Sequence, residues 1–257
     1  RVQRRLVDKG VLQADVPDHE DSFPLPDSDF DNAVESVVND YDGVAVLLTD
    51  PARALPRIRR AYQKAAGDDK QIYAQILATL GADDGASVLA EMVRSRSWDE
   101  GWNFVGMGQF GRSMSPLDDL VVALGRTRNS RIALPPIVEK AEQLDADDAF
   151  SHFRAIAMAC ETLRDPGAAP ALAALLQKPG IRGHEIRDVR TAVQKTPAER
   201  NDTTTRNLAL RELVTARALY LCGDRDSIGE RVLRTYAGDL RAHFAAHATA
   251  VLCANTR

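Results

Sequence analysis

The stretch from Gly106 to Gly111 is the first place where residue types and spacing could do chemistry. Its glycines follow the pattern G-x-G-x-x-G, which in dinucleotide-binding proteins lets the backbone approach a pyrophosphate at the start of a helix. That chemistry needs a strand directly before the loop, and residues 98–103 are loop-like in composition. The pattern therefore does not predict a dinucleotide site.

Aromatic side chains and one arginine surround these glycines. Trp98, Trp102, Phe104 and Phe110 lie close together in a chain that is only 5% aromatic, and Arg112 follows them. Aromatic residues are favoured at docking surfaces because they bury a large area with little loss of rotamer freedom. An arginine can pair with a carboxylate or a phosphate. These five are the candidate binding residues, and the loop is expected either to pack on its own protein or to contact a partner.

Two histidines near the end of the chain have the spacing of metal ligands on a helix. His243 and His247 are four residues apart, and Asp239 lies four residues before His243, so one helix would place all three on one face. Zinc proteases with this spacing carry a Glu directly after the first histidine, where this chain has Phe244. We expect a packed polar ridge and assign no metal site.

Ser151 and His152 are of the residue types that act in hydrolysis. A Ser–His–Asp triad is defined by geometry in three dimensions, so neighbours in sequence do not predict one. Ser151 follows the acidic stretch 145–148, which is favourable near the positive end of a helix. Ser151 is therefore predicted to be a helix N-cap, and no catalytic residues are assigned.

Composition excludes several classes of protein. The net charge is −4, from 33 basic and 37 acidic residues, whereas nucleic-acid binders usually carry a basic surplus. No apolar stretch is long enough to span a bilayer. The cysteines are too far apart in sequence to indicate a metal site, and they are expected in the core. They are Cys160, Cys222 and Cys253.

The elements that must position these residues are helices. Ala and Leu supply most of the apolar content, and similar units recur: a helix ending in Leu, a turn with Gly or Asp, and a second amphipathic helix. The leucines that end the units, at 80, 124, 163 and 221, are 44, 39 and 58 residues apart. The first two spacings are close to the repeat of roughly 40–47 residues in HEAT and armadillo arrays. An insertion, Lys178–Arg206, accounts for the third. The sequence thus predicts an all-α fold, an α-solenoid of HEAT-like hairpins with a Gly/Trp-rich loop insertion.

Local signals predict where several helices begin. Asp50-Pro51 and Ser115-Pro116 each place a capping side chain before a proline at the first helical position. Residues Thr196–Glu199 have the form of a capping box and predict another start.

The chain is expected to have three parts. Residues 1–12 resemble the trailing end of a preceding segment, and residues 13–31 form an acidic, proline-rich linker. Within it, Pro17 to Asp31 contains three prolines, six acidic residues and no Lys or Arg, so it should run extended over a surface. Residues 32–257 form the helical array.

Several segments of the array resemble the C-terminal helical part of a bacterial group of FAD-dependent oxidoreductases that carry HEAT-like repeats behind a flavin domain. The resemblance is strongest from about Trp98 to Leu252. It implies that FAD binds an N-terminal Rossmann-type domain that this sequence does not contain, so no cofactor is expected in this chain. No flavin-binding or catalytic residue of the group maps onto a position here. The segments that carry the resemblance are 98–113, 124–127, 150–155, 176–180, 216–220, 222–224 and 236–252.

Three functions remain open from the sequence. The first is a non-catalytic interaction module that docks on a flavin-binding domain in cis or on another protein, through residues 98–112 and the insertion. The second is a substrate-binding part of such an oxidoreductase, in which the 98–112 loop reaches its active site. The third is a free-standing protein-binding scaffold, as many helical arrays are.

Overall fold

Every regular element in the described part of the chain is a helix. The computed structural model describes residues 25–39, 42–99, 101–102, 114–199 and 202–254. Within these ranges it has thirteen α-helices and two short 3-10 helices, so the all-α class is confirmed. The α-helices are α2 (Asp27–Ser36), α3 (Asp42–Thr49), α4 (Pro51–Lys64), α5 (Gly67–Thr79), α6 (Ala86–Ser95), α7 (Pro116–Arg126), α8 (Ser130–Gln143), α9 (Phe150–Leu163), α10 (Ala169–Gln177), α11 (Val189–Lys195), α12 (Thr204–Leu221), α13 (Ile228–Tyr236) and α14 (Ala242–Ala254).

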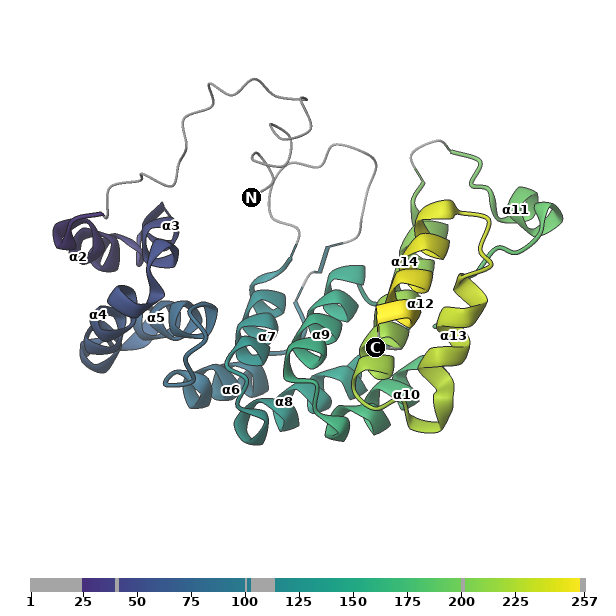
Figure 1. The fold of residues 1–257 in the computed structure, drawn as a ribbon. Helices are drawn as coiled ribbons and strands as arrows, with labels where there is room; N and C mark the ends of the chain where they lie inside the picture. Colours follow the sequence, from purple (N-terminus) through teal and green to yellow (C-terminus); the bar gives the residue numbers. More distant parts are fainter. Residues whose placement is uncertain (1–24, 40–41, 100, 103–113, 200–201, 255–257) are drawn as a thin grey trace, which may run out of the picture.

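Helices α5 to α10 and α12 pack in two rows (Figure 1). In one row α5 contacts α7, α7 contacts α9, and α9 contacts α12. In the other row α6 contacts α8, and α8 contacts α10. Consecutive helices, such as α6 and α7 or α8 and α9, connect the rows. Each helix in the two rows therefore buries its apolar stripe against helices next to it in the chain and in its row.

Small residues allow neighbouring helices to approach closely. A Cβ atom added to Gly125 on α7 would lie 2.5 Å from the Cα atom of Ala159 on α9. At Gly85, before α6, an added Cβ would lie 2.6 Å from the Cβ atom of Ala74 on α5. Because real Cβ atoms do not approach other atoms so closely, these crossings depend on glycine, and backbone contact sets the spacing of the rows.

Two of the predicted helix starts are confirmed. The Asp50 side chain accepts a hydrogen bond from the backbone N–H of Arg53, and Pro51 begins α4. Ser115 forms a capping box with Asp118 at the start of α7. The start predicted at Thr196–Glu199 is wrong, because α11 ends at Lys195 and the next helix in the described residues begins only at Thr204.

The structure differs from the predicted extended linker at its C-terminal end. Residues 13–24 lie outside the described residues, but the last five residues of the linker form the first turn of α2. Phe30 is fully buried there, with the Arg53 guanidinium 4.3 Å from its ring centroid. Arg53 also pairs with Asp27 at 2.6 Å, and Arg57 pairs with Asp31 at 2.8 Å. These contacts with α4 give an acidic segment a helical conformation that its composition does not predict.

Candidate functional site

Trp98 and Trp102 are packed against the core between α6 and α7. The Trp98 ring lies on the His152 ring, with 4.4 Å between centroids, and its Nε1 donates to the backbone carbonyl of Lys140 at 3.2 Å. The backbone N–H of Trp102 donates to the Ser151 hydroxyl at 2.9 Å, and the Ser151 N–H donates to the Trp102 carbonyl at 3.0 Å. We call these contacts, together with the hydrogen bond of His152 to Asp118, the tryptophan anchor.

The other candidate binding residues cannot be placed in the same way. Phe104, Phe110 and Arg112, and the whole glycine pattern from 106 to 111, lie outside the described residues. Met114, which follows this stretch, also packs on the core, and Ser115 is buried. The described residues on both sides of the segment are therefore fixed to the helical array.

A buried ion pair is the centre of the tryptophan anchor. Asp118 Oδ1 on α7 lies 2.7 Å from His152 Nδ1 on α9, and His152 is only 2% exposed. The other carboxylate oxygen of Asp118 accepts from the backbone N–H of Ser115 at 2.8 Å. His152 Nε2 faces the backbone carbonyl of Asp99 at 3.2 Å. Because both ring nitrogens face acceptors, the doubly protonated imidazolium satisfies both contacts.

The pKa shifts of the pair follow from this geometry. Burial alone would lower the pKa of His152, but the hydrogen bond and the charge of Asp118 outweigh it, so the pKa is raised from 6.5. Burial alone would raise the pKa of Asp118, but hydrogen bonds from His152, Ser151 and the Ser115 backbone lower it below 3.8. Both shifts favour the charged pair.

This arrangement fits positioning rather than hydrolysis. A hydrolytic triad needs the serine hydroxyl at the histidine nitrogen that is remote from the carboxylate. Here that nitrogen faces the Asp99 carbonyl, while the Ser151 hydroxyl bonds Trp102 and the Asp118 carboxylate. The prediction that Ser151 is an N-cap is wrong, because Ala149 has that position and Ser151 lies inside α9.

Gly101 completes the tryptophan anchor. A Cβ atom there would lie 2.2 Å from the Ala149 Cβ and 2.6 Å from His152 Nε2. Glycine therefore lets the segment lie directly on the start of α9. Sequence reasoning missed the Asp118–His152 pair, whose members are 34 residues apart. The one local signal was the acidic residue three positions after the Ser115 cap.

The ion pair predicts a pH dependence of stability. Because the pKa of His152 is raised on folding, its contribution is fully present below 6.5 and is lost as pH rises through the folded-state pKa. Asp118, with a lowered pKa, loses its contribution only as pH falls below 3.8. We expect the difference in free energy of unfolding between wild type and His152→Gln to shrink between about pH 6 and pH 9 in urea titrations.

Taking the difference between wild type and His152→Gln cancels the pH-dependent contributions of titratable groups that both proteins contain. Among them are His243 and His247, whose pKa values are lowered, mainly by burial, and which favour folding at higher pH instead. A difference that stays constant over this pH range would show that His152 is not charged in the folded protein.

A second anchor holds the first part of the insertion. The buried carboxylate of Glu212 on α12 accepts the backbone N–H groups of Gly183 at 3.2 Å and His184 at 2.9 Å, and the Tyr236 hydroxyl at 2.9 Å. Burial and then Glu212 raise the pKa of Tyr236, so its hydroxyl remains a donor. Asp239 accepts the N–H of Ile186 at 2.9 Å. We call these contacts the insertion anchor.

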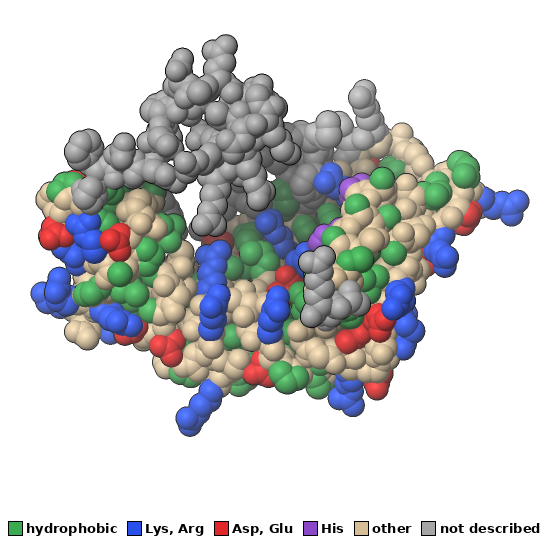
Figure 2. All heavy atoms as spheres, in the orientation of Figure 1, with side chains coloured by type: hydrophobic (Ala, Val, Ile, Leu, Met, Phe, Trp, Pro, Cys, Tyr) green, Lys and Arg blue, Asp and Glu red, His purple; other side chains and the backbone are tan. Residues whose placement is uncertain are grey.

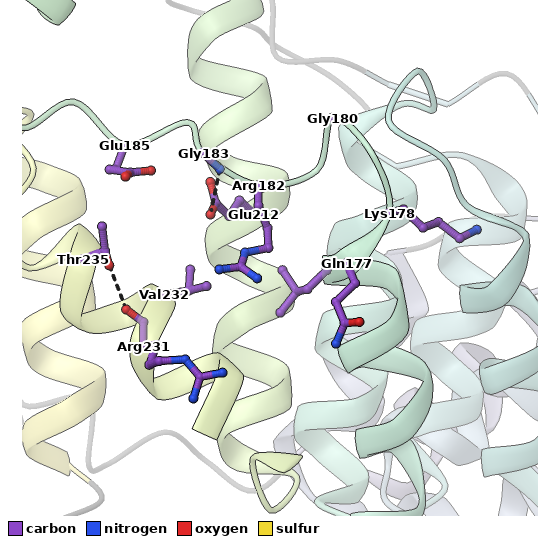
Figure 3. A pocket seen from close by; sticks show the side chains of 11 residues that line it. Gln177, Lys178, Gly180, Arg182, Gly183, Glu185, Glu212, Arg231, Val232 and Thr235 are labelled. Carbon is purple, nitrogen blue, oxygen red and sulfur yellow. Dashed lines mark hydrogen bonds between the residues drawn. The ribbon is translucent and has the colours of Figure 1, made fainter. Parts of the chain in front are cut away.

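A groove of about 810 Å³ lies beside the insertion anchor, between the loop after α10 and helix α13. Figure 3 shows Arg182 and Arg231 extending into it from the loop and from α13. Glu185 and the anchored Glu212 also line it, so its charges are mixed. The groove is therefore an open, polar surface groove, one side of which is held in place by the hydrogen bonds of Glu212.

The histidines near the end of the chain form no metal site with Asp239 in the described residues. Asp239 is not on the helix of the two histidines, since α14 begins at Ala242, and it bonds Ile186 and Arg241 instead. His247 Nε2 lies 3.2 Å from the guanidinium of Arg217. No group of three or more metal-ligating side chains occurs within the described ranges.

Two of the three cysteines are in the core as predicted. Cys160 and Cys222 are buried, and Cys253 is exposed. Burial raises the pKa of Cys222 to about 12 and raises that of Cys160 as well. These two buried thiols therefore stay protonated and unreactive at neutral pH.

Basic and acidic side chains are interspersed over the face drawn in Figure 2. None of the helices in the described ranges combines the length and hydropathy needed to cross a membrane. Comparisons with protein-family models, with curated proteins and with solved structures each found no match to this chain.

Proposed function

We propose that the chain is a HEAT-like α-solenoid that acts as a non-catalytic interaction module. The two rows of helices are the scaffold, and residues 98–112 and the insertion are the parts presented to a partner. The observation that carries the proposal is the tryptophan anchor. A buried ion pair, a stacked tryptophan and two hydrogen bonds between Trp102 and Ser151 hold the base of the 98–112 segment to α9.

The energetics of the anchor support a positioning role. A buried ion pair adds little net stability compared with well-packed apolar residues, because desolvation offsets the attraction of the charges. Such a pair does fix geometry, since each charge needs its partner and its hydrogen bonds in place. In this chain the contacts around the ion pair fix the positions of Trp98, Asp99 and Trp102, which directly precede residues 103–113.

The partner that we propose is a flavin-binding domain, in cis or as a separate protein. This part of the proposal rests on the resemblance of residues 98–252 to the helical part of FAD-dependent oxidoreductases. FAD would then bind the partner domain and not this chain. The array would dock on that domain or shape access to it.

The test supplies a flavin-binding domain of this oxidoreductase group as a separate polypeptide. We expect it to bind this chain one to one with a dissociation constant of about 10 µM or tighter, measured by calorimetry. The triple variant Phe104→Ala, Phe110→Ala, Arg112→Ala should weaken binding about tenfold or more. Trp98 and Trp102 are left intact because their packing fixes the anchor.

The control is Leu48→Ala on α3, which removes an exposed apolar side chain far from the tryptophan anchor. It should leave the dissociation constant unchanged. Absence of binding, or equal binding by the triple variant, would overturn the proposal. Flavin bound to this chain alone would contradict the non-catalytic assignment. If the triple variant raised KM for a substrate without weakening domain binding, the loop would be part of a substrate site.

A further inference from the structure

Helix α11 buries none of its seven residues, yet polar contacts hold it in a defined position at the edge of the array (Figure 1). The Lys195 ammonium donates to the Gly183 carbonyl at 2.9 Å, which ties the helix to the loop that precedes it. The Thr205 hydroxyl on α12 donates to the Lys195 carbonyl at 3.1 Å. These contacts place α11 where it forms one wall of a pocket.

The pocket beside α11 has a volume of about 380 Å³, and we call it the α11 pocket. This volume is within the range of pockets that bind small molecules. Four stretches of chain form its walls: the loop before α11, α11 with the turn after it, the start of α12, and the residues before α14. The lining residues are Ile186, Ala192, Lys195, Thr196, Pro197, Asp202, Thr205, Arg206, Leu240 and Arg241.

Hydrogen bonds between these stretches fix the shape of the α11 pocket. The Leu240 N–H donates to the Ile186 carbonyl at 2.7 Å, and the Asp239 carboxylate accepts the Ile186 N–H at 2.9 Å. Arg241 pairs with Asp239 at 2.7 Å and donates to the His184 carbonyl at 2.8 Å. Together with the bond from α12 to α11, these contacts join all four walls. The α11 pocket is therefore formed by the fold itself, as ligand pockets usually are.

Apolar side chains supply part of the surface of the α11 pocket. Ile186 is only 6% exposed, and Ala192 and Pro197 lie on the wall that α11 and its following turn provide. Leu240 is 52% exposed and is one of four large hydrophobic side chains that are exposed among the described residues. A ligand with an apolar body would cover this side chain, and removing it from water is favourable.

Positive side chains outnumber negative ones around the α11 pocket. Lys195, Arg206 and Arg241 line it, whereas Asp202 is the one acidic residue of the lining. Even when Asp239, the partner of Arg241, is counted, the ratio is three to two. The pocket therefore favours an anion over a neutral or cationic ligand.

Two further observations agree with this excess of positive charge. The Lys195 ammonium donates to backbone carbonyls, and no carboxylate of the described residues pairs with it. The pKa of His243, on the helix that follows the pocket, is lowered by burial first and then by the charges of Arg206 and Arg241. Such a shift is the effect of nearby positive charge on a basic group.

We propose that the α11 pocket binds a small organic anion, a carboxylate with an apolar body. The apolar body contacts Ile186 and Leu240, and the carboxylate lies at Lys195 and the neighbouring guanidinium groups. Hydrogen bonds from ammonium and guanidinium groups to a carboxylate are stronger than those between neutral groups. The inference does not depend on a flavin-binding partner, because none of the lining residues belongs to the tryptophan anchor.

A titration with octanoate, followed by the methyl NMR signals of isoleucine and leucine in the whole chain, tests the proposal. We expect the Ile186 and Leu240 signals to shift with a dissociation constant of about 1 mM or tighter, which is reasonable for about ten non-hydrogen atoms. Ile58, fully buried on α4, should not shift. An absence of shifts at Ile186 and Leu240 would overturn the proposal.

Octanamide tests the charge of the ligand, because it has the same apolar body and no negative charge. It should bind roughly fivefold more weakly than octanoate or worse, and high salt should weaken octanoate alone. Equal affinity for the two compounds would contradict the assigned chemistry.

Matched variants on α11 locate the ligand. Ala192→Trp fills the pocket and should abolish octanoate binding, whereas Val189→Trp adds the same ring at a position that is 71% exposed and outside the lining, and should leave the dissociation constant unchanged. Lys195→Gln should weaken binding about fivefold or more, and Lys195→Arg, which keeps the charge, should retain most of the affinity. Arg190→Gln removes a charge from the same helix outside the lining and should change the dissociation constant less than about twofold. Binding that survives Ala192→Trp, or equal losses in Lys195→Gln and Arg190→Gln, would overturn the placement of the ligand in the α11 pocket.

Discussion

Asp118→Ala is expected to lower the free energy of unfolding by about 3–5 kcal/mol, the cost typical of removing one partner from a buried ion pair. The substitution leaves the His152 ring charged or forces it to lose a proton, and it leaves the Ser115 N–H without its acceptor. Chemical denaturation followed by circular dichroism measures the change. The two tryptophans of the chain both lie in the anchor, so their fluorescence reports its loosening directly.

Asp188→Ala is a matched control for this variant. Asp188 is also a carboxylate that accepts a backbone N–H at the start of a helix, from Thr191 at 2.9 Å, but it is exposed. Its removal should cost only about 1 kcal/mol, the usual effect of losing a helix cap. It should also leave tryptophan emission unchanged. Similar losses in the two variants would show that Asp118 acts as a plain cap and that the pair with His152 contributes nothing further.

Gly125→Val is expected to destabilise the fold by about 3 kcal/mol, through overpacking where α7 crosses α9. The nearest atom to an added Cβ is the Ala159 Cα, at 2.5 Å, so the helices themselves must separate. The better helix propensity of a non-glycine residue offsets only part of this cost. The loss is measured by thermal and chemical denaturation.

Two further variants isolate the steric cause. Gly238→Ala should be nearly neutral, because the nearest atom to its added Cβ is a side-chain nitrogen of Arg187 at 3.5 Å. Ala159→Gly should not restore the Gly125→Val protein, since the backbone contact at Cα remains. If Ala159→Gly did restore stability, the crossing would depend on side-chain volume instead of backbone approach.

Local signals in the sequence predicted much of the helical framework. The predicted ends near Leu80, Leu124, Leu163 and Leu221 lie within about two residues of the ends of α5, α7, α9 and α12. Helix termini can be predicted because caps, prolines and glycines act within a few residues along the chain. The Ser115 cap is an example in which the side chain and its partner are three residues apart.

The anchors could not be predicted in this way, because their partners meet only when helices pack. Asp118 and His152 lie on different helices, and Glu212 meets His184 from 28 residues away. The sequence marked Trp98 and Trp102 as candidate binding residues on account of their size, whereas their contacts in the described part of the chain are with its own core. Helix α11 was also not predicted, since only seven residues form it and none is buried.

The two anchors are mechanically coupled through a pair of adjacent helices. The tryptophan anchor uses residues of α9, the insertion anchor uses Glu212 of α12, and α9 packs along α12. Arg217 on α12 donates two hydrogen bonds, at 2.6 and 3.0 Å, to the carboxylate of Glu161 on α9. Sliding of one helix past the other would break this bidentate ion pair. Packing and this ion pair therefore fix the position of the tryptophan anchor relative to the insertion anchor.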